Sequence, residues 1–308
     1  MYPAAAIAVA LSCASSFALA AEHKIARIAE GVYALQPPVE TGSEDQLRRA
    51  NVSFVVGPRG VAVIDTGISY REGLEIIAAV RRVTRRPILF ALITHPGQEA
   101  IFGAAAFQAQ HIPVLMHRDA AMLMANRCET CLRRLEETLG AGAMAATRVV
   151  EPDRLIDGDE VNDAIGRKLR VIAPAWSSAP GALAVLDERT STLIAGSLVS
   201  IRSVPDTRDA DARGWRDALA LLAATRCRHL VPSFGAVGSC SDIDAFARYF
   251  IDLETRVTEL LRAGAGLAEL GARSDLPQYA HWDRYDALNR ANAGRAYLRL
   301  ERALFNNP

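Results

Sequence analysis

The pattern of apolar and polar positions alternates between short strands and longer helices along most of the chain. Short apolar runs bounded by turn residues predict strands at 31–35, 51–57, 60–67, 87–94, 113–117, 182–187, 192–195 and 228–232. Apolar residues at helical spacing predict helices at 70–83, 118–139, 243–263, 266–270 and 287–304. The segment Gly57-Pro58-Arg59-Gly60 has hairpin turn chemistry. With no repeat and no low-complexity linker, this order predicts one α/β domain with a helical C-terminal extension.

Composition narrows the functions that are compatible with this architecture. Half of the 308 residues are hydrophobic, which is enough to bury a large core. Lys+Arg and Asp+Glu both number 35, so no overall basic field favours nucleic acid or an anionic membrane as a partner. The basic segment at 81–86 is typical of a solvated helix end, where cations suit the helix dipole.

The first twenty residues have the features of a secretory signal peptide. Residues 4–20 carry no charge, and they end in Ala18-Leu19-Ala20, which resembles a cleavage site. No Lys or Arg precedes the apolar run, so a retained membrane anchor is the alternative. We predict cleavage near Ala20, a periplasmic or secreted protein, and no stable membrane insertion afterwards. The predicted boundaries are therefore 1–20 for the signal and 21–308 for the domain, with 242–308 mainly helical.

Four cysteines remain after removal of the signal, namely Cys128, Cys131, Cys227 and Cys240. An even number in an oxidising compartment favours disulfides. The C-x-x-C of Cys128 and Cys131 lies in a predicted helix and is compatible with a redox pair, half of a zinc site or a disulfide. Cys227 and Cys240 do not form a second C-x-x-C, which disfavours a zinc site made of four cysteines.

Several short motifs along the chain carry a family resemblance. They are Val63-Ile64-Asp65-Thr66-Gly67, Thr94-His95 after an apolar strand, Gly103-Ala104, Ala195-Gly196-Ser197-Leu198 and Val231-Pro232-Ser233-Phe234-Gly235. In this order they resemble the metallo-β-lactamase fold, a four-layer αβ/βα sandwich, over about 26–304. The C-terminal segment 289–301 is most similar to the exported quinoprotein relay system zinc metallohydrolases, a SoxH-like branch.

The resemblance implies a two-zinc site, whose ligands this chain largely replaces. In the first cluster the family has T-H-x-H-x-D-H, where this chain keeps His95 and has Gly97, Glu99 and Ala100 at the other ligand positions. Three later ligand positions, two histidines and a bridging aspartate in the family, hold Ser178, Phe234 and Ser197. Asp65 matches a residue that is often structural beneath the metal site in this family.

Zinc requires about four donors, three of them from the protein even in a catalytic site. His95 and Glu99 are weak candidates and cannot make a tight site by themselves, so we expect no zinc and no other cofactor. Phe234, with Trp176 nearby, is expected to fill the space that zinc would occupy. These replacements predict a pseudoenzyme rather than an active hydrolase.

Three hypotheses for the function remain open. The first is a non-catalytic binding or accessory protein for a small molecule or an exported protein partner, linked to a periplasmic quinoprotein dehydrogenase system. The second is a hydrolase of ester or thioester-like substrates, using metal at His95 and Glu99 or a serine activated by His95, although no G-x-S-x-G elbow is present. The third is a redox accessory built on Cys128 and Cys131, with Cys128 as the reactive thiol.

Overall fold

The N-terminal half of the chain forms the first of two β-sheets. The structure is a computed structural model that describes residues 23–37 and 49–306. This sheet has seven strands in sequence order, antiparallel from β1 to β4 and parallel from β4 to β7. Its strands are β1 (Lys24–Ala29), β2 (Val32–Gln36), β3 (Val52–Val56), β4 (Val61–Ile64), β5 (Ile88–Ile93), β6 (Val114–His117) and β7 (Arg154–Ile156).

The second sheet has the strand order β12-β11-β10-β9-β8. Only β11 and β12 are parallel, and the other neighbours are antiparallel. Its strands are β8 (Glu160–Asn162), β9 (Leu169–Ile172), β10 (Ala184–Asp187), β11 (Thr192–Ser200) and β12 (His229–Phe234).

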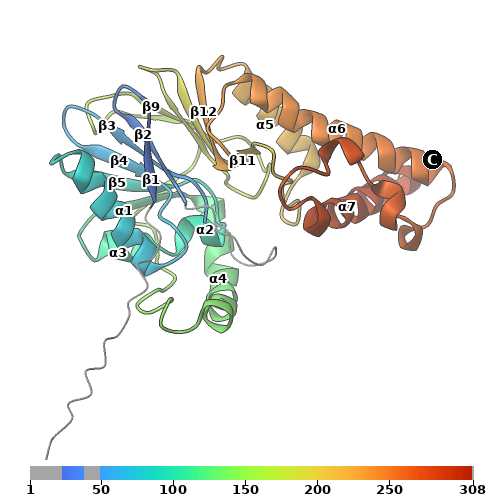
Figure 1. The fold of residues 1–308 in the computed structure, drawn as a ribbon, viewed down its shortest axis with the longest axis horizontal. Coiled ribbons are helices and arrows are strands. Elements are labelled where there is room, and N and C mark those ends of the chain that lie inside the picture. Colours follow the sequence, from blue (N-terminus) through green and yellow to red (C-terminus); the bar gives the residue numbers. More distant parts are fainter. Residues whose placement is uncertain (1–22, 38–48, 307–308) are drawn as a thin grey trace, which may run out of the picture.

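Side-chain alternation along the strands produces the layers. In β4, Val61 and Val63 pack against helices, whereas Ala62 and Ile64 pack between the two sheets. The outer helices of the first sheet are α1 (Tyr70–Val83), α2 (Gln98–Ile101), α3 (Ala104–Gln108) and α4 (Arg118–Leu139). Helices α5 (Ala212–Ala223) and α6 (Ser241–Arg262) cover the outer face of the second sheet. The predicted four-layer αβ/βα sandwich is therefore confirmed (Figure 1).

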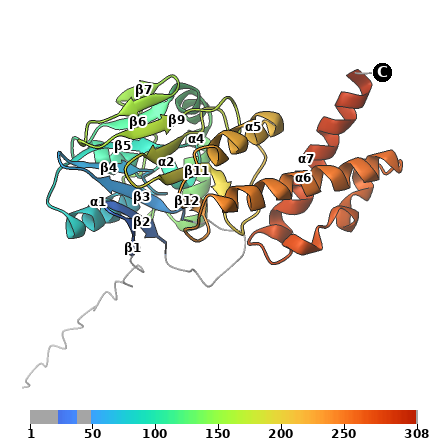
Figure 2. The same ribbon diagram turned by 90° about the horizontal axis from the view of Figure 1, so that it is seen from above.

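The C-terminal part is helical over the residues that the structure describes, as predicted. After α6 come three short 3-10 turns, at Leu267–Glu269, Gly271–Ser274 and Pro277–Tyr279, and then α7 (Tyr285–Asn306). Helices α6 and α7 extend to one side of the sandwich (Figure 2). Aromatic contacts among Tyr249, Tyr279 and Trp282 hold this part together.

Most predicted elements are present, and a few were missed. The limits of α1 and α4 coincide with the predicted helices at 70–83 and 118–139, and the β3–β4 connection is the predicted hairpin, closed by a Gly57 N to Gly60 O hydrogen bond of 2.9 Å. The sequence pattern did not reveal β1, β7, β8, β9 or α5. The predicted signal peptide lies outside the described residues. Within 23–37 and 49–306, no helix is both long enough and apolar enough to cross a membrane.

Candidate functional site

The candidate site lies where strands of both sheets end. Asp65 directly follows β4, Thr94 and His95 follow β5, and Phe234 ends β12. Two backbone hydrogen bonds join the sheets at this edge, from Leu183 N to Thr94 O (2.7 Å) and from Asn51 N to Ser233 O (2.8 Å). The topology thus brings the predicted site residues to the same edge of the sandwich.

Asp65 is buried beneath the site and is held by Thr94. Its Oδ1 accepts a hydrogen bond from Thr94 N at 2.8 Å, and Thr94 Oγ1 lies 3.0 Å from each carboxylate oxygen. Burial raises the pKa of Asp65, and the opposing effects of the His95 charge and the Thr94 hydrogen bonds do not cancel that rise. Asp65 therefore has a structural role, holding the segment from which His95 projects.

Both ring nitrogens of His95 are engaged. Nδ1 lies 2.8 Å from Thr94 Oγ1, and Nε2 lies 2.9 Å from Glu99 Oε1. Burial lowers the pKa of His95, but the hydrogen bond and charge of Glu99, together with the charge of Asp65, outweigh burial and raise it. The protonated imidazole can then donate from Nε2 to Glu99 and from Nδ1 to Thr94, whose hydroxyl donates to Asp65.

Glu99 is the anionic partner of His95. Burial raises the pKa of Glu99, yet the hydrogen bond and charge of His95 outweigh this effect and lower it, with a smaller contribution from the positive charge of Arg284. The side chains of His95 and Glu99 are 4% and 17% exposed, so water screens their attraction only in part. The two residues form a charge-assisted pair between the segment after β5 and the first turn of α2.

Gly97 lies directly against this pair. A Cβ atom at position 97 would be 2.6 Å from both His95 Nε2 and Glu99 Oε1. Any side chain at this position would therefore displace one of the two groups. The glycine that replaces a family histidine is the residue that lets His95 and Glu99 meet.

The structure also brings together the two serines at later ligand positions. Ser178 Oγ and Ser197 Oγ are 2.8 Å apart. Strand β11 approaches Thr94 closely here, because a Cβ at Gly196 would lie 2.4 Å from Thr94 Oγ1. These ligand positions therefore meet as the resemblance implies, but they present neutral hydroxyls in place of a histidine and an aspartate.

The expectation that Trp176 fills the metal position is wrong. Its side chain is among the exposed large hydrophobic groups, with 56% exposure for the residue, and its Nε1 donates to Asp209 O at 2.7 Å. The indole is thus bound to the segment at 206–209 and largely open to solvent, so it does not fill an interior space. Phe234 is half-buried at the end of β12, where its carbonyl accepts from Ile201 N at 2.9 Å.

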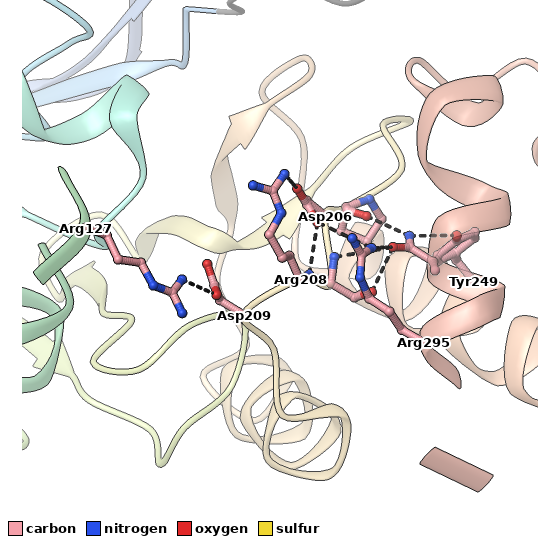
Figure 3. A network of polar contacts seen from close by, with 9 residues as sticks. Arg127, Asp206, Arg208, Asp209, Tyr249 and Arg295 are labelled. Carbon is pink, nitrogen blue, oxygen red and sulfur yellow. Dashed lines mark hydrogen bonds and ion pairs between the residues drawn. The ribbon is translucent and has the colours of Figure 1, made fainter. Parts of the chain in front are cut away.

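A polar network fixes the segment at 206–209, whose Asp209 carbonyl binds Trp176 (Figure 3). On one side, Arg127 of α4 pairs with Asp209 at 2.5 Å. On the other, Asp206 lies 2.8 Å from Arg208 and 3.6 Å from Arg295 of α7. The segment at 206–209 is thereby anchored to α4 of the sandwich and to α7 of the C-terminal extension.

The residues present do not fit the zinc ion that this fold implies. Among the residues that the structure describes, no three His, Cys, Asp or Glu side chains come together as a metal-binding group. The available donors, His95 and Glu99, bind one another, and Asp65 is bound to Thr94. A zinc site needs at least three protein donors that are free to bind the metal.

The geometry also gives no support to a serine nucleophile. Within 23–37 and 49–306, no hydrogen bond joins His95 to Ser177, Ser178 or Ser197, because both of its nitrogens are bound elsewhere. Thr94 and Arg284 were missed as parts of the site. Thr94 is adjacent to His95 and was visible in the motif, whereas nothing in the sequence indicates that Arg284 comes near Glu99.

Comparison with known proteins agrees with this fold. A family model described as "Metallo-beta-lactamase superfamily" matches residues 46–233, more than half of the chain. The chain belongs to the metallo-β-lactamase superfamily. None of the curated proteins compared matches this superfamily member.

Solved structures of this superfamily are similar to the chain in fold. A metallo-β-lactamase from Pontibacter korlensis is 20% identical, with a TM-score of 0.63 over 74% of this chain and 99% of the other. The metallo-β-lactamase FIM-1 from Pseudomonas aeruginosa, in its mono-zinc form, is 17% identical, with a TM-score of 0.58 over 74% and 94%. A double mutant of the sec-alkyl sulfatase PisA1 is 15% identical, with a TM-score of 0.68 over 90% of this chain and 50% of its own. At such identities the likeness concerns the fold alone.

Proposed function

We propose that this chain is an exported metallo-β-lactamase-fold protein that has lost metal-dependent hydrolysis and acts as a binding or accessory protein. The observation that carries the proposal is the bonding of His95, whose two ring nitrogens are taken by Thr94 and Glu99. A zinc ligand must offer an unprotonated ring nitrogen to the metal, and here the surroundings of His95 favour the protonated ring.

Releasing His95 from Glu99 would still leave the site incomplete. The two freed side chains would supply one nitrogen and one carboxylate, while Gly97 and Ala100 supply no side-chain donor. Ser178 and Ser197 offer neutral hydroxyls, which are poor zinc ligands. With fewer than three good donors, zinc would not be held in the geometry that lowers the pKa of bound water.

The place of action follows from the leader sequence and the family branch. We propose that the mature protein begins near Ala21 in the periplasm, and that it serves a quinoprotein dehydrogenase system through a small molecule or an exported protein partner. N-terminal sequencing of the exported chain tests the first part, since a chain that begins at Met1 would contradict cleavage.

The loss of hydrolysis is tested by activity measurements with and without added zinc. β-Lactam, ester and thioester substrates would be assayed with the wild-type chain and the His95→Ala variant, with FIM-1 prepared in the same way as the positive control. We expect no zinc-stimulated turnover by either form of this chain. Zinc-stimulated turnover that the His95→Ala variant loses would instead support the alternative, a metal-dependent hydrolase with an altered site.

A further inference from the structure

A pair of cysteine thiols lies on α4, away from the His95 site. Cys128 and Cys131 lie three positions apart in the helix, with two residues between them, and both are free. Cα atoms at this spacing in an α-helix are about 5 Å apart, within the range that a disulfide bridges. At this helical spacing the Cβ atoms are about 5–6 Å apart, so a disulfide requires them to approach one another by about 1–2 Å.

The two thiols differ in access. Cys128 belongs to the buried stripe of α4 with Met124 and Leu132, and it is 3% exposed. Cys131 packs at the edge of the same core and is half-buried, next to exposed Thr130. A molecule in solution can therefore reach Cys131 but not Cys128, which reverses the order expected from the sequence.

A cationic side chain precedes Cys128 in the chain. Arg127 interacts electrostatically with Cys128 and Cys131, and its guanidinium is fixed by Asp209 at 2.5 Å. A neighbouring positive charge stabilises a thiolate, which is the form that attacks disulfides. Two thiols alone are too few for a zinc site, and no metal-binding group occurs among the described residues, so the pair is better suited to thiol chemistry.

We propose that Cys128 and Cys131 form a dithiol site that exchanges with disulfides in the exported compartment, with Cys131 as the thiol that attacks first. This activity is independent of the lost hydrolase site. It assigns a chemical class of reactant, an accessible disulfide, to a surface that lies outside the family's metal site.

The exchange takes place in two steps. The Cys131 thiolate attacks one sulfur of the reactant disulfide, that S–S bond breaks, and the departing thiolate takes up the proton that Cys131 lost. Cys128 then loses its proton and attacks Cys131 Sγ, which forms the Cys128–Cys131 bond and releases the second reactant thiol. Two thiols of this chain are oxidised to one disulfide, and one reactant disulfide is reduced to two thiols.

Cys128 ionises poorly as long as Cys131 has not reacted. Burial raises the pKa of Cys128 to about 12, and the charge and hydrogen bond of Cys131 add to the rise. Once Cys131 is in a mixed disulfide, its charge is gone, so Cys128 ionises more readily than before. Cys128 is therefore the resolving thiol.

The test uses glutathione disulfide with the full mature chain and two matched variants, Cys128→Ser and Cys131→Ser. Alkylation followed by peptide mass mapping reports each cysteine. The wild-type chain should gain a Cys128–Cys131 disulfide without a lasting adduct. Cys128→Ser should accumulate a glutathione adduct on Cys131 at least about tenfold faster than Cys131→Ser accumulates one on Cys128.

Two results would overturn the proposal. One is a wild-type chain that keeps both thiols at every ratio of glutathione disulfide to glutathione. The other is equal adduct formation by the two variants while circular dichroism shows both to be folded. If Cys128→Ser does not fold, Cys128→Ala takes its place, because it keeps the buried position apolar.

Discussion

Nε2 of His95 lies 2.9 Å from Oε1 of Glu99, so two residues at metal-ligand positions of the family bind each other. The contact passes Gly97, and it joins the two remaining polar residues of the first ligand cluster directly to each other. On the buried side, His95 continues through Thr94 to Asp65. A chain of hydrogen bonds therefore runs from Glu99 through His95 and Thr94 to Asp65 at the end of β4.

Replacing Gly97 by alanine should weaken this contact. A Cβ there would be 2.6 Å from both His95 Nε2 and Glu99 Oε1, so one of the two side chains must move. We expect a loss of about 1–3 kcal/mol in the free energy of unfolding, measured by urea denaturation. Gly142→Ala is the matched control, because a Cβ at Gly142 meets nothing within 4 Å. Equal stability of the two variants would argue against a tightly packed pair.

The stability that His95 supplies should depend on pH in a defined direction. Its raised pKa means that its contribution is complete below the ordinary value of 6.5 and is lost as pH rises through the pKa of the folded state. The lowered pKa of Glu99 means that its contribution is complete above its ordinary value of 4.5 and is lost as pH falls. The pair is thus most stabilising between these two values. The contribution of Asp65, whose pKa is raised, is complete below its ordinary value of 3.8 and is lost as the pH rises through the pKa of the folded state.

The His95→Gln variant tests this dependence, since glutamine keeps hydrogen-bonding groups but cannot be charged. The difference in unfolding free energy between the wild-type chain and this variant should shrink as the pH rises above 6.5, the ordinary pKa of histidine. A difference that stays constant or grows over that range would show that His95 is not held in its charged form.

The elements that could be predicted from the sequence are those whose pattern is long and regular. Helices α1 and α4 have apolar stripes over many turns, and their limits were correct. Strands β7 and β8 have only three residues each, which leaves too little alternation to detect. Helix α5 was missed although Asp211 caps it and Trp215, Ala218, Leu219 and Leu222 form a buried stripe, because the polar residues at 206–213 obscure its start.

The site was predictable in its location but not in its bonding. The motifs placed His95, Ser178 and Ser197 at one edge of the sandwich, and the structure brings them there. That His95 binds Glu99 depends on the room left by Gly97 and on side-chain directions, which spacing does not give. Likewise, the sequence allowed several pairings of four cysteines, and only the fold brings Cys227 to Cys240.

The buried ion pair of Arg167 and Asp187, which lies next to the β1–β2 turn, should be sensitive to the loss of one partner. Arg167 binds both carboxylate oxygens of Asp187 and donates to Glu30 O at 2.7 Å. Arg167→Ala would leave Asp187 charged and buried, and we expect the free energy of unfolding to fall by about 3–5 kcal/mol. Arg189→Ala, which removes an exposed pair with Glu30, is the control and should change stability little. Similar losses in both variants would contradict this assignment.

The Cys227–Cys240 disulfide should stabilise the connection between β12 and α6. The bond joins residues 13 apart in sequence, just before β12 and at the start of α6. Replacing both cysteines by alanine should lower the free energy of unfolding by about 3 kcal/mol, as determined from denaturant titration. An unchanged midpoint and slope would indicate that the packing around β12 holds this connection without the bond.

We expect the His95 site to hold no zinc, and a measurement of the metal content tests this most directly. The exported chain would be purified without chelators and its metals measured by inductively coupled plasma mass spectrometry, with FIM-1 purified alongside. We expect zinc and iron far below stoichiometric amounts in this chain, with no difference between the wild-type protein and His95→Ala. About one equivalent of zinc or iron per chain, lost in His95→Ala, would contradict it.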